Sequence, residues 1–380
     1  MASMIEPVDS AAKLGLVLSG GGSRAAYQAG VLKGLVEIKP DIKIPILTGL
    51  SAGAINVAFL AGEAASMPRA IHRLCKLWSE LRTDQVFRSD FATLMMTGIR
   101  LIMDLSFGGI YRHTASSSLL KTDPLERLLS EVIQFENIPK NLELGNIEAV
   151  SVAATDYGNT ESVSFFSSRD HSAMPWTRKR RRSESVNLGV EHIMASSALP
   201  ILFPPIRVRD SYFGDGVLRN TTPLSPAVHL GAEKLLIVGV RRQRESIERV
   251  RLEKEPALGR IMSVVMNAIL LDTADMDVER LQRINQTISL LSEEGRQKSQ
   301  LRPIDFVWIT PSEDIGEIAK AHANKLPLIL RYLLRGTGTK SEYSEISSYL
   351  LFEPEFCTKL IELGYKDCLK RRPDIEKLLN

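Results

Sequence analysis

Short apolar runs alternate with helical patterns over the first sixty residues of the chain. Leu14–Leu18 is an apolar run that ends in one serine and three glycines, which is typical of a buried strand followed by a turn. Apolar residues at helical spacing then predict a helix over Ala25–Ile38. Ile44–Thr48 reads as a buried parallel strand, and Ala54–Ala61 as an almost wholly apolar helix. Strand, helix, strand and helix in this order predict a right-handed βαβ unit within an α/β layered fold.

The rest of the chain predicts more strands and then a mainly helical end. Further apolar runs predict strands at Ile147–Ala154, Ser162–Phe166, Ser211–Phe213, Leu235–Val240 and Ile304–Thr310. The densely charged stretch Arg241–Glu255 marks a soft boundary, so we expect an α/β domain over 14–245 and a helical region over 246–380 that packs on it. A long amphipathic helix is expected over Leu258–Leu291. The Met-rich stretch Phe91–Phe107 predicts either a buried core helix or an apolar wall for an acyl chain.

Composition limits the classes of protein that the chain can belong to. The 380 residues are 44% apolar and 24% charged, which is typical of a globular protein. A net charge of +3 is too small to argue for a nucleic-acid partner. Three cysteines without a CxxC motif indicate a reducing compartment and neither a disulfide framework nor a zinc site. The first fifteen residues lack the pattern of a signal peptide, and no apolar run reaches about 18 residues. We therefore expect a cytoplasmic protein whose contact with the inner membrane, if it has one, is peripheral.

The strongest chemical signal is Gly49-Leu50-Ser51-Ala52-Gly53, which fits the motif G-x-S-x-G between an apolar strand and an apolar helix. Glycines two residues either side of a serine permit a strained strand-to-helix turn. The turn exposes the serine hydroxyl at a helix N-terminus, where free N–H groups favour developing negative charge. Ser51 is therefore the candidate nucleophile.

The glycine run Gly20-Gly21-Gly22 lies one βα unit upstream of Ser51. In a parallel sheet both loops lie at the carboxyl ends of the strands, so they can share one site. The N–H groups of Gly20, Gly21 and Gly22 are then candidate donors to an oxyanion. Arg24, in the first turn of the helix that follows, is either a contact for that anion or an ordinary surface arginine.

A nucleotide-binding function is the alternative from another class. Gly20-x-Gly22-x-x-Ala25 also matches the dinucleotide fingerprint, and Asp41 lies at about the right distance along the chain. However, the acidic residue of that fingerprint should end the second strand, whereas Asp41 precedes it. The glycine run is therefore better explained as an oxyanion site beside Ser51 than as a nucleotide-binding loop.

A serine nucleophile needs a base. None of the six histidines follows a strand in a Gly- or Pro-rich loop; they are His72, His113, His171, His192, His229 and His322. Gly214-Asp215-Gly216 places a carboxylate between two glycines directly after a short aromatic strand, although the same letters suit an ordinary hairpin turn. An unperturbed carboxyl titrates near pH 4, so an Asp base would keep activity at lower pH than a histidine base, unless burial beside Phe213 raises its pKa.

Several motifs in this order strongly resemble the patatin-like phospholipases of bacteria. They are the Gly20–Gly22 run with Arg24, the Ser51 motif, Ala195-Ser196-Ser197-Ala198-Leu199-Pro200, Phe203-Pro204 and Asp215-Gly216. The resemblance covers roughly Leu14 to Val240. It implies a three-layer α/β/α fold with a mainly parallel central sheet, extended here by a helical C-terminal region, and hydrolysis of lipid acyl esters without a metal or other cofactor.

The resemblance also implies roles for particular residues. Ser51 would be the nucleophile and Asp215 the base of a Ser–Asp dyad, with Gly20, Gly21 and Gly22 lining the oxyanion hole and the Ala52 N–H as a further donor. Two residues depart from the family pattern, since Val217 follows the Asp-Gly pair and Ala25 follows Arg24 where many members have small residues or glycine. An acyltransferase that uses the same acyl-enzyme, and a catalytically silent lipid-binding protein, remain alternatives.

The basic run Arg178–Arg182 follows Trp176 closely. It is either a solvated basic loop or a contact for anionic lipid, to which each charge would contribute about 1 kcal/mol. In the second case Trp176 would anchor at the membrane interface. The sequence leaves both interpretations open.

Overall fold

The fold is organised around one large β-sheet. The computed structural model describes residues 12–88, 118–169, 173–243, 273–299, 301–327 and 340–380, together with the single residues 255, 264 and 331. In these segments ten strands form one sheet. The strands are β1 (Leu14–Leu18), β2 (Ile46–Leu50), β3 (Ala149–Asp156), β4 (Glu161–Ser168), β5 (Thr177–Arg178), β6 (Arg181–Ser185), β7 (Ile206–Val208), β8 (Ser211–Asp215), β9 (Lys234–Val238) and β10 (Asp305–Ile309). They are ordered β10-β9-β1-β2-β3-β4-β6-β5, and β7 and β8 lie off this path.

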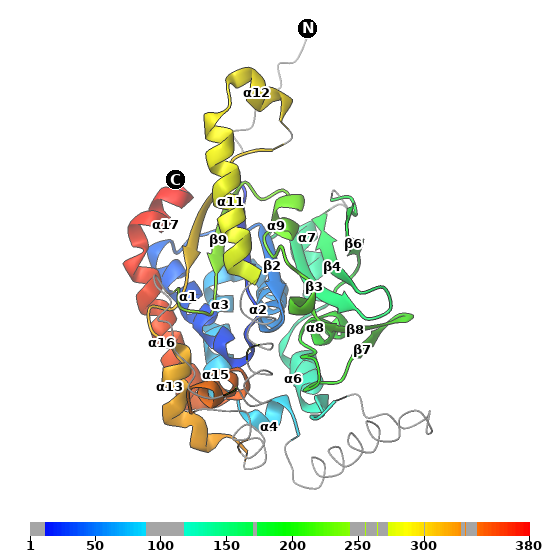
Figure 1. Ribbon diagram of the computed structural model, residues 1–380, viewed down its shortest axis with the longest axis vertical. Helices are drawn as coiled ribbons and strands as arrows, with labels where there is room; N and C mark the ends of the chain where they lie inside the picture. The colour runs from blue at the N-terminus through cyan, green and yellow to red at the C-terminus, as the bar shows by residue number, and fades with distance from the viewer. Residues whose placement is uncertain are drawn as a thin grey trace.

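The five strands β10, β9, β1, β2 and β3 run parallel, and β4 then pairs antiparallel to β3. The residues of β1, β2 and β9 are mostly apolar because both faces of a parallel sheet are covered. The sheet carries helices on both faces, so the fold is the three-layer α/β/α arrangement that the sequence predicts (Figure 1).

The described helices are α1 (Ala26–Ile38), α2 (Ala52–Gly62), α3 (Met67–Glu80), α4 (Thr83–Val86), α6 (Asp123–Val132), α7 (Asn137–Glu143), α8 (Val190–Ser196), α9 (Ser225–His229), α11 (Thr273–Leu290), α12 (Glu293–Lys298), α13 (Ile315–His322), α15 (Lys340–Leu350), α16 (Pro354–Lys370) and α17 (Arg372–Leu379), with short 3-10 turns η1 (Gly22–Ala25), η2 (Ala64–Ser66), η4 (Gly216–Leu218) and η5 (Ala323–Lys325). Alternate residues of the strands divide the core in two. Leu236 and Val238 of β9 face the core formed with α1, α2 and α16, whereas Leu235 and Ile237 face α9 and α11.

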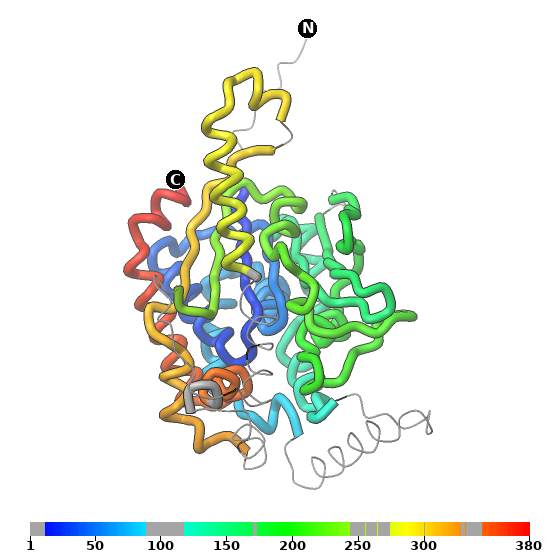
Figure 2. The backbone as a smooth tube through the Cα atoms, in the orientation of Figure 1, coloured from blue at the N-terminus to red at the C-terminus, as the bar shows by residue number. Residues whose placement is uncertain are grey.

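The C-terminal region shares the sheet and the helix layer of the rest of the chain. β10 pairs with β9, and α16 packs along α1, where a Cβ atom on Gly30 would lie 2.0 Å from the Ile361 carbonyl oxygen. The absence of side chains at such points lets the two helix backbones approach closely. Figure 2 shows the orange and red C-terminal segment lying beside the blue amino-terminal helix. The two regions expected from the sequence are therefore joined through one sheet.

The sequence predicts the long strands to within about two residues and misses three short ones. β2 begins two residues later than expected, and β5, β6 and β7 were not predicted. The expected helix over Leu258–Leu291 is described only from Thr273, where α11 begins. The Met-rich stretch Phe91–Phe107 lies outside the described residues. β5 and β7 have only two and three residues, and β6 is wholly polar, so none of them shows an apolar run that would predict a strand.

The basic run Arg178–Arg182 is a β-hairpin rather than a loop. β5 and β6 pair antiparallel, and β6 also joins the sheet beside β4. Arg182 forms ion pairs with Glu184 and with the fully buried Asp156, at 3.2 Å from the latter. Arg178, Lys179 and Arg180 are exposed at the turn. Only this part of the run is free to meet a charged surface.

Trp176 is partly buried and packs against the core. Its ring stacks on Phe166 with 5.3 Å between ring centroids and on His229 at 4.9 Å. These contacts hold the indole against the sheet, which favours a packing role for Trp176 over an anchor at a membrane interface. In the part of the chain that the structure describes, no helix has the length and apolar character needed to cross a bilayer.

Candidate active site

Ser51 lies at the strained turn between β2 and α2. Its backbone φ is +51°, a left-handed value that is uncommon for a residue with a side chain, and its side chain is buried. The two motif glycines are explained by close backbone approach. A Cβ atom on Gly49 would lie 2.3 Å from the Gly53 carbonyl oxygen, and one on Gly53 would lie 2.4 Å from the Leu18 carbonyl oxygen. The spacing G-x-S-x-G is therefore needed to fit the turn between its own helix and β1.

Asp215 meets Ser51 because β3 is longer than β2. The last residue of β2, Leu50, pairs with Ala153, and β3 continues three residues further. β8 pairs with this overhang, and its last residue, Asp215, lies opposite Ala154. That is the position that Ser51 would reach if β2 were extended by one residue. The hydroxyl of Ser51 donates a hydrogen bond of 2.7 Å to Asp215 Oδ2.

The Asp215 carboxyl group is fully buried, and the second oxygen, Oδ1, accepts from the Val217 N–H at 2.9 Å. Burial raises the pKa of Asp215 to about 7, against the lowering effect of the hydrogen bonds from Ser51 and Val217. A carboxyl group with this pKa can take up and release a proton near neutral pH. The chemistry that the sequence assigned to Asp215 is thus available to it, at a higher pH than an unperturbed carboxyl allows.

Three consecutive residues at the end of α8 hold both members of the pair. Ser196 Oγ accepts from the Ser51 N–H at 3.0 Å and donates to the Ala153 carbonyl at 2.6 Å. Ser197 Oγ donates to the Ser51 carbonyl at 3.2 Å, and the Ala198 carbonyl accepts from the Asp215 N–H at 2.9 Å. The sequence marked this segment only as part of the resemblance. In the structure it fixes the backbone on both sides of the strained turn.

The glycine run lies against Ser51. A Cβ atom on Gly20 would lie 3.1 Å from Ser51 Cβ and 2.7 Å from Val217 Cγ2, so the backbone of Gly20 is packed between them. Among the described residues, none accepts a hydrogen bond from the N–H of Gly20 or Gly21. Ala52 is the first residue of α2, where helical N–H groups have no carbonyl partner in the helix. Of the sequence-predicted donors, Gly20 thus lies against Ser51, and Gly22 and Ala52 line the pocket beside it.

Arg24 has partners other than those expected from the sequence. Its side chain is almost completely buried, and its Nε donates to Ser348 Oγ at 2.7 Å. The guanidinium also lies 4.3 Å from the ring centroid of Tyr349. It is neither a surface arginine nor directed to the expected oxyanion site, and instead contacts α15.

A buried chain of hydrogen-bonded side chains reaches the backbone directly before the glycine run. The Trp78 indole donates to Asn56 Oδ1 at 2.7 Å, and Asn56 Nδ2 donates to Gln28 Oε1 at 2.9 Å. Gln28 Nε2 then donates to the Ser19 carbonyl, directly before the glycines, at 2.7 Å. Sequence reasoning missed this chain, although one signal was present: Asn56 is the single polar residue of an otherwise apolar helix. A polar group in such a place needs a partner.

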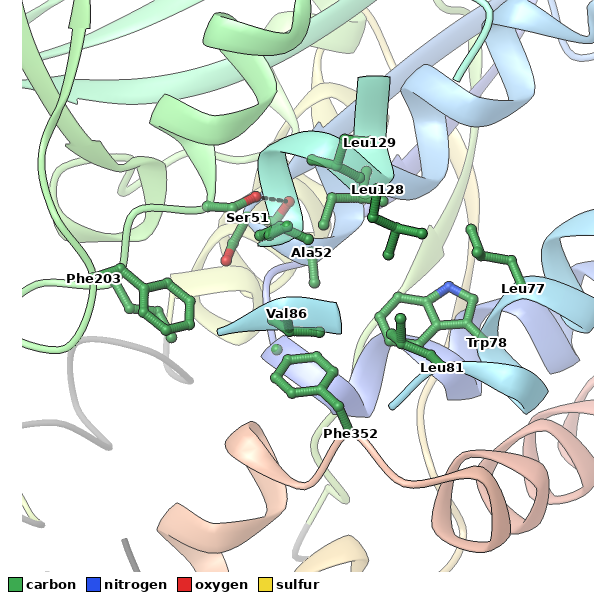
Figure 3. A pocket seen from close by; sticks show the side chains of 15 residues that line it. Ser51, Ala52, Leu77, Trp78, Leu81, Val86, Leu128, Leu129, Phe203 and Phe352 are labelled. Atoms are coloured by element: carbon green, nitrogen blue, oxygen red, sulfur yellow. Dashed lines mark hydrogen bonds between the residues drawn. The ribbon is translucent and has the colours of Figure 1, made fainter. Parts of the chain in front are cut away.

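A small apolar pocket opens beside Ser51 (Figure 3). Its lining includes Ser51, Ala52, Leu77, Trp78, Leu81, Val86, Leu129, Phe203 and Phe352. In Figure 3 Leu77 and Leu81 lie at the end away from Ser51. Such a pocket suits an acyl chain whose carbonyl carbon lies at the serine.

The described histidines lie elsewhere. His192 Nδ1 accepts from the Gly189 N–H, His229 stacks on Trp176, and His322 faces Glu355. No described histidine hydrogen-bonds to Ser51 or Asp215, and His113 and His171 lie outside the described residues.

The structure also bears on the nucleotide-binding alternative. Asp41 lies before β2, at the end of the strand away from Ser51, where it is exposed and paired with Lys39. It cannot meet a ribose at the carboxyl end of that strand. This removes the acidic residue on which the alternative depended.

A family model described as patatin-like phospholipase matches residues 16–228, more than half of the 380 residues. The crystal structure of VipD from Legionella pneumophila is similar at 14% sequence identity and a TM-score of 0.39, covering 97% of this chain and 67% of that one. The structure of full-length SpcU in complex with full-length ExoU from the type III secretion system of Pseudomonas aeruginosa is similar at 14% identity and a TM-score of 0.28, covering 88% and 70%. No curated protein matches the chain. The family match spans both Ser51 and Asp215.

Proposed function

The chain belongs to the patatin-like phospholipase family, and we propose that it is a serine hydrolase of lipid acyl esters with Ser51 as nucleophile and Asp215 as base. Membership of the family supports a lipid hydrolase. The observation that carries the finer assignment is the 2.7 Å hydrogen bond from the Ser51 hydroxyl to the buried Asp215 carboxylate, beside an apolar pocket. This is the distance at which a base takes a proton from a nucleophile.

In the proposed reaction, Ser51 Oγ attacks the acyl carbonyl carbon while its proton passes to Asp215 Oδ2. The N–H groups of Gly20, Gly21, Gly22 and Ala52 then stabilise the negative oxygen of the tetrahedral intermediate. Collapse of the intermediate expels the alcohol, which takes the proton from Asp215 and leaves an acyl-enzyme. Water, deprotonated by Asp215, attacks the acyl-enzyme; the fatty acid leaves as Asp215 returns the proton to Ser51 Oγ.

The raised pKa of Asp215 determines the pH at which this base works. A general base must be ionised, so activity is expected to rise with pH through about 7. The expectation of activity at low pH therefore does not hold for this carboxyl group, because burial shifts its titration to the range of a histidine. Mutants, and not the pH profile, have to distinguish the two bases.

We also propose that the β5–β6 hairpin contacts anionic lipid through Arg178, Lys179 and Arg180. These three side chains are exposed, whereas Arg182 is held by carboxylates of the protein. Three charges near a lipid surface would contribute about 3 kcal/mol in total. The three cysteines, Cys75, Cys357 and Cys368, are free thiols, which supports the cytoplasm as the place of action.

The test is labelling with a fluorophosphonate followed by mapping of the modified residue, with Ser51→Ala as the matched variant. We expect a single adduct on Ser51, and loss of hydrolysis of a medium-chain nitrophenyl ester by Ser51→Ala with an unchanged circular dichroism spectrum. A folded Ser51→Ala protein with full activity would refute the assignment. An acyltransferase would form the same adduct, so free fatty acid and transferred acyl product must be measured together.

A further inference from the structure

The glycine run is packed against helix α15 of the C-terminal region. Gly22 has a φ of +55°, and a Cβ atom at this position would lie 2.2 Å from the Tyr349 carbonyl oxygen. Ser23 Oγ donates to the Ser348 carbonyl at 2.7 Å. Two successive residues of the loop thus meet the backbone of two successive residues near the end of α15, more than 300 residues away in the chain.

Arg24 makes further polar contacts with the same helix. Its Nε donates to Ser348 Oγ at 2.7 Å, and its Nη2 donates to the Glu345 carbonyl at 3.3 Å and lies 3.5 Å from the Glu345 carboxylate. Burying a guanidinium costs several kcal/mol unless its N–H groups are paired. The groups that pair it all belong to α15, so the turn that follows the glycines is held in place by that helix.

The residues after α15 also form part of the acyl pocket. Phe352 lines the pocket together with Ser51, and its carbonyl accepts from the Thr83 hydroxyl at 3.1 Å. One short segment of the C-terminal region, 345–352, therefore contacts both the glycine run and the pocket.

We propose that Ser348, acting through Arg24, is a positioning residue for the glycine run, so that the C-terminal region completes the active site. This inference rests on the proposed function, because it concerns the N–H groups assigned to the oxyanion. A displacement of about 1 Å in such a site can lower the rate about 100-fold. The regions 14–245 and 246–380 then act as one catalytic unit.

The experiment compares Ser348→Ala with Ser347→Ala, the same change at the neighbouring, equally buried position of α15. Ser348→Ala keeps the Arg24 charge and removes the acceptor of its Nε. The kcat and KM of a soluble short-chain nitrophenyl ester are measured per fluorophosphonate-titrated site, together with the affinity for a trifluoromethyl ketone that mimics the tetrahedral intermediate. For Ser348→Ala we expect kcat to fall roughly 10- to 100-fold with little change in KM. The affinity for the ketone should fall in parallel.

Further variants test whether Ser348 acts through Arg24. The double variant Arg24→Gln/Ser348→Ala is expected to lose no more kcat than Arg24→Gln alone, because both changes remove the same Arg24–Ser348 hydrogen bond. Ser348→Thr, which keeps the hydroxyl, should recover most of kcat. If Ser348→Ala is unstable, Arg24→Lys, which keeps the charge but loses the Nε bond, gives the same comparison of kcat with ketone affinity.

Three results would overturn the inference: a wild-type kcat per titrated site in folded Ser348→Ala, an equal loss in Ser347→Ala, or losses that multiply in the double variant. If Ser51→Ala keeps full activity, the proposed function fails and this inference with it. If Ser51 is required and Ser348→Ala matches wild type, the inference alone is wrong.

Discussion

Replacing Asp215 by Asn should abolish activity and stabilise the protein at the same time. The carboxyl group is fully buried and has a pKa of about 7, compared with 3.8 for the exposed group. The folded protein therefore binds a proton at Asp215 more tightly than the unfolded chain does, by about three pKa units. At about 1.4 kcal/mol per unit, ionised Asp215 costs the folded protein about 4 kcal/mol above pH 7. Domains are stable by only about 5–15 kcal/mol, so this is a large fraction.

The sign and the pH window follow from the raised pKa. Below pH 3.8 the carboxyl group is neutral in both the folded and the unfolded state, so it does not lower the free energy of unfolding. Between pH 3.8 and 7 it ionises in the unfolded chain but stays protonated in the folded protein, so the free energy of unfolding falls as the pH rises. Asn cannot ionise, but it has a similar size and can still accept from the Val217 N–H. Asp215→Asn should therefore gain up to about 4 kcal/mol over wild type at pH 8, and this gain should vanish towards pH 4.

The assay is urea unfolding of both proteins at several pH values from 4.5 to 8.5, alongside ester hydrolysis. The difference between the two free energies of unfolding cancels the titration of all other groups. The rate should fall on the order of 10²–10⁴-fold, the usual contribution of a positioned base. A stability difference that is flat with pH would refute the buried, proton-sharing carboxyl. High activity in Asp215→Asn would refute its role as base.

Three further predictions test the surroundings of the pair. Ser196→Ala should lower kcat about 10-fold or more with little change in KM, because the strained backbone of Ser51 loses its partner; an unchanged kcat would make Ser196 merely a packing residue. Asn56→Leu should destabilise the fold by roughly 2–3 kcal/mol in thermal unfolding, because buried donors and acceptors lose their partner; a stability equal to wild type would show that water replaces it. Replacing Arg178, Lys179 and Arg180 by Ser should weaken co-sedimentation with phosphatidylserine vesicles at low salt and spare hydrolysis of a soluble ester, whereas salt-insensitive, unchanged binding would return the hairpin to an ordinary exposed turn.

Much of the fold and the position of Ser51 could be predicted from short stretches of sequence. The strands β1 and β9 are continuous apolar runs, and the glycines around Ser51 are required by clashes within a few residues of the turn or with the adjacent strand. Such features depend on residues that are close together in the chain, so the spacing of residue types along the sequence can predict them. The Asp215 assignment needed the family resemblance, because Gly-Asp-Gly alone also describes a hairpin.

The tertiary structure decided how these residues meet and what surrounds them. Ser51 and Asp215 are 164 positions apart, and they come together because β3 extends beyond β2 and pairs with β8 there. The sequence carries no record of this difference in strand length at the sheet edge. The same holds for electrostatics, since a pKa depends on desolvation and on neighbours in space. Burial therefore raises the pKa of Asp215 to about 7, and α15 supplies the partners of Arg24 in place of the expected oxyanion. The spacing of residues identifies Ser51 as a candidate nucleophile, but only the packing of distant segments sets the geometry and the charge of the Ser51–Asp215 pair.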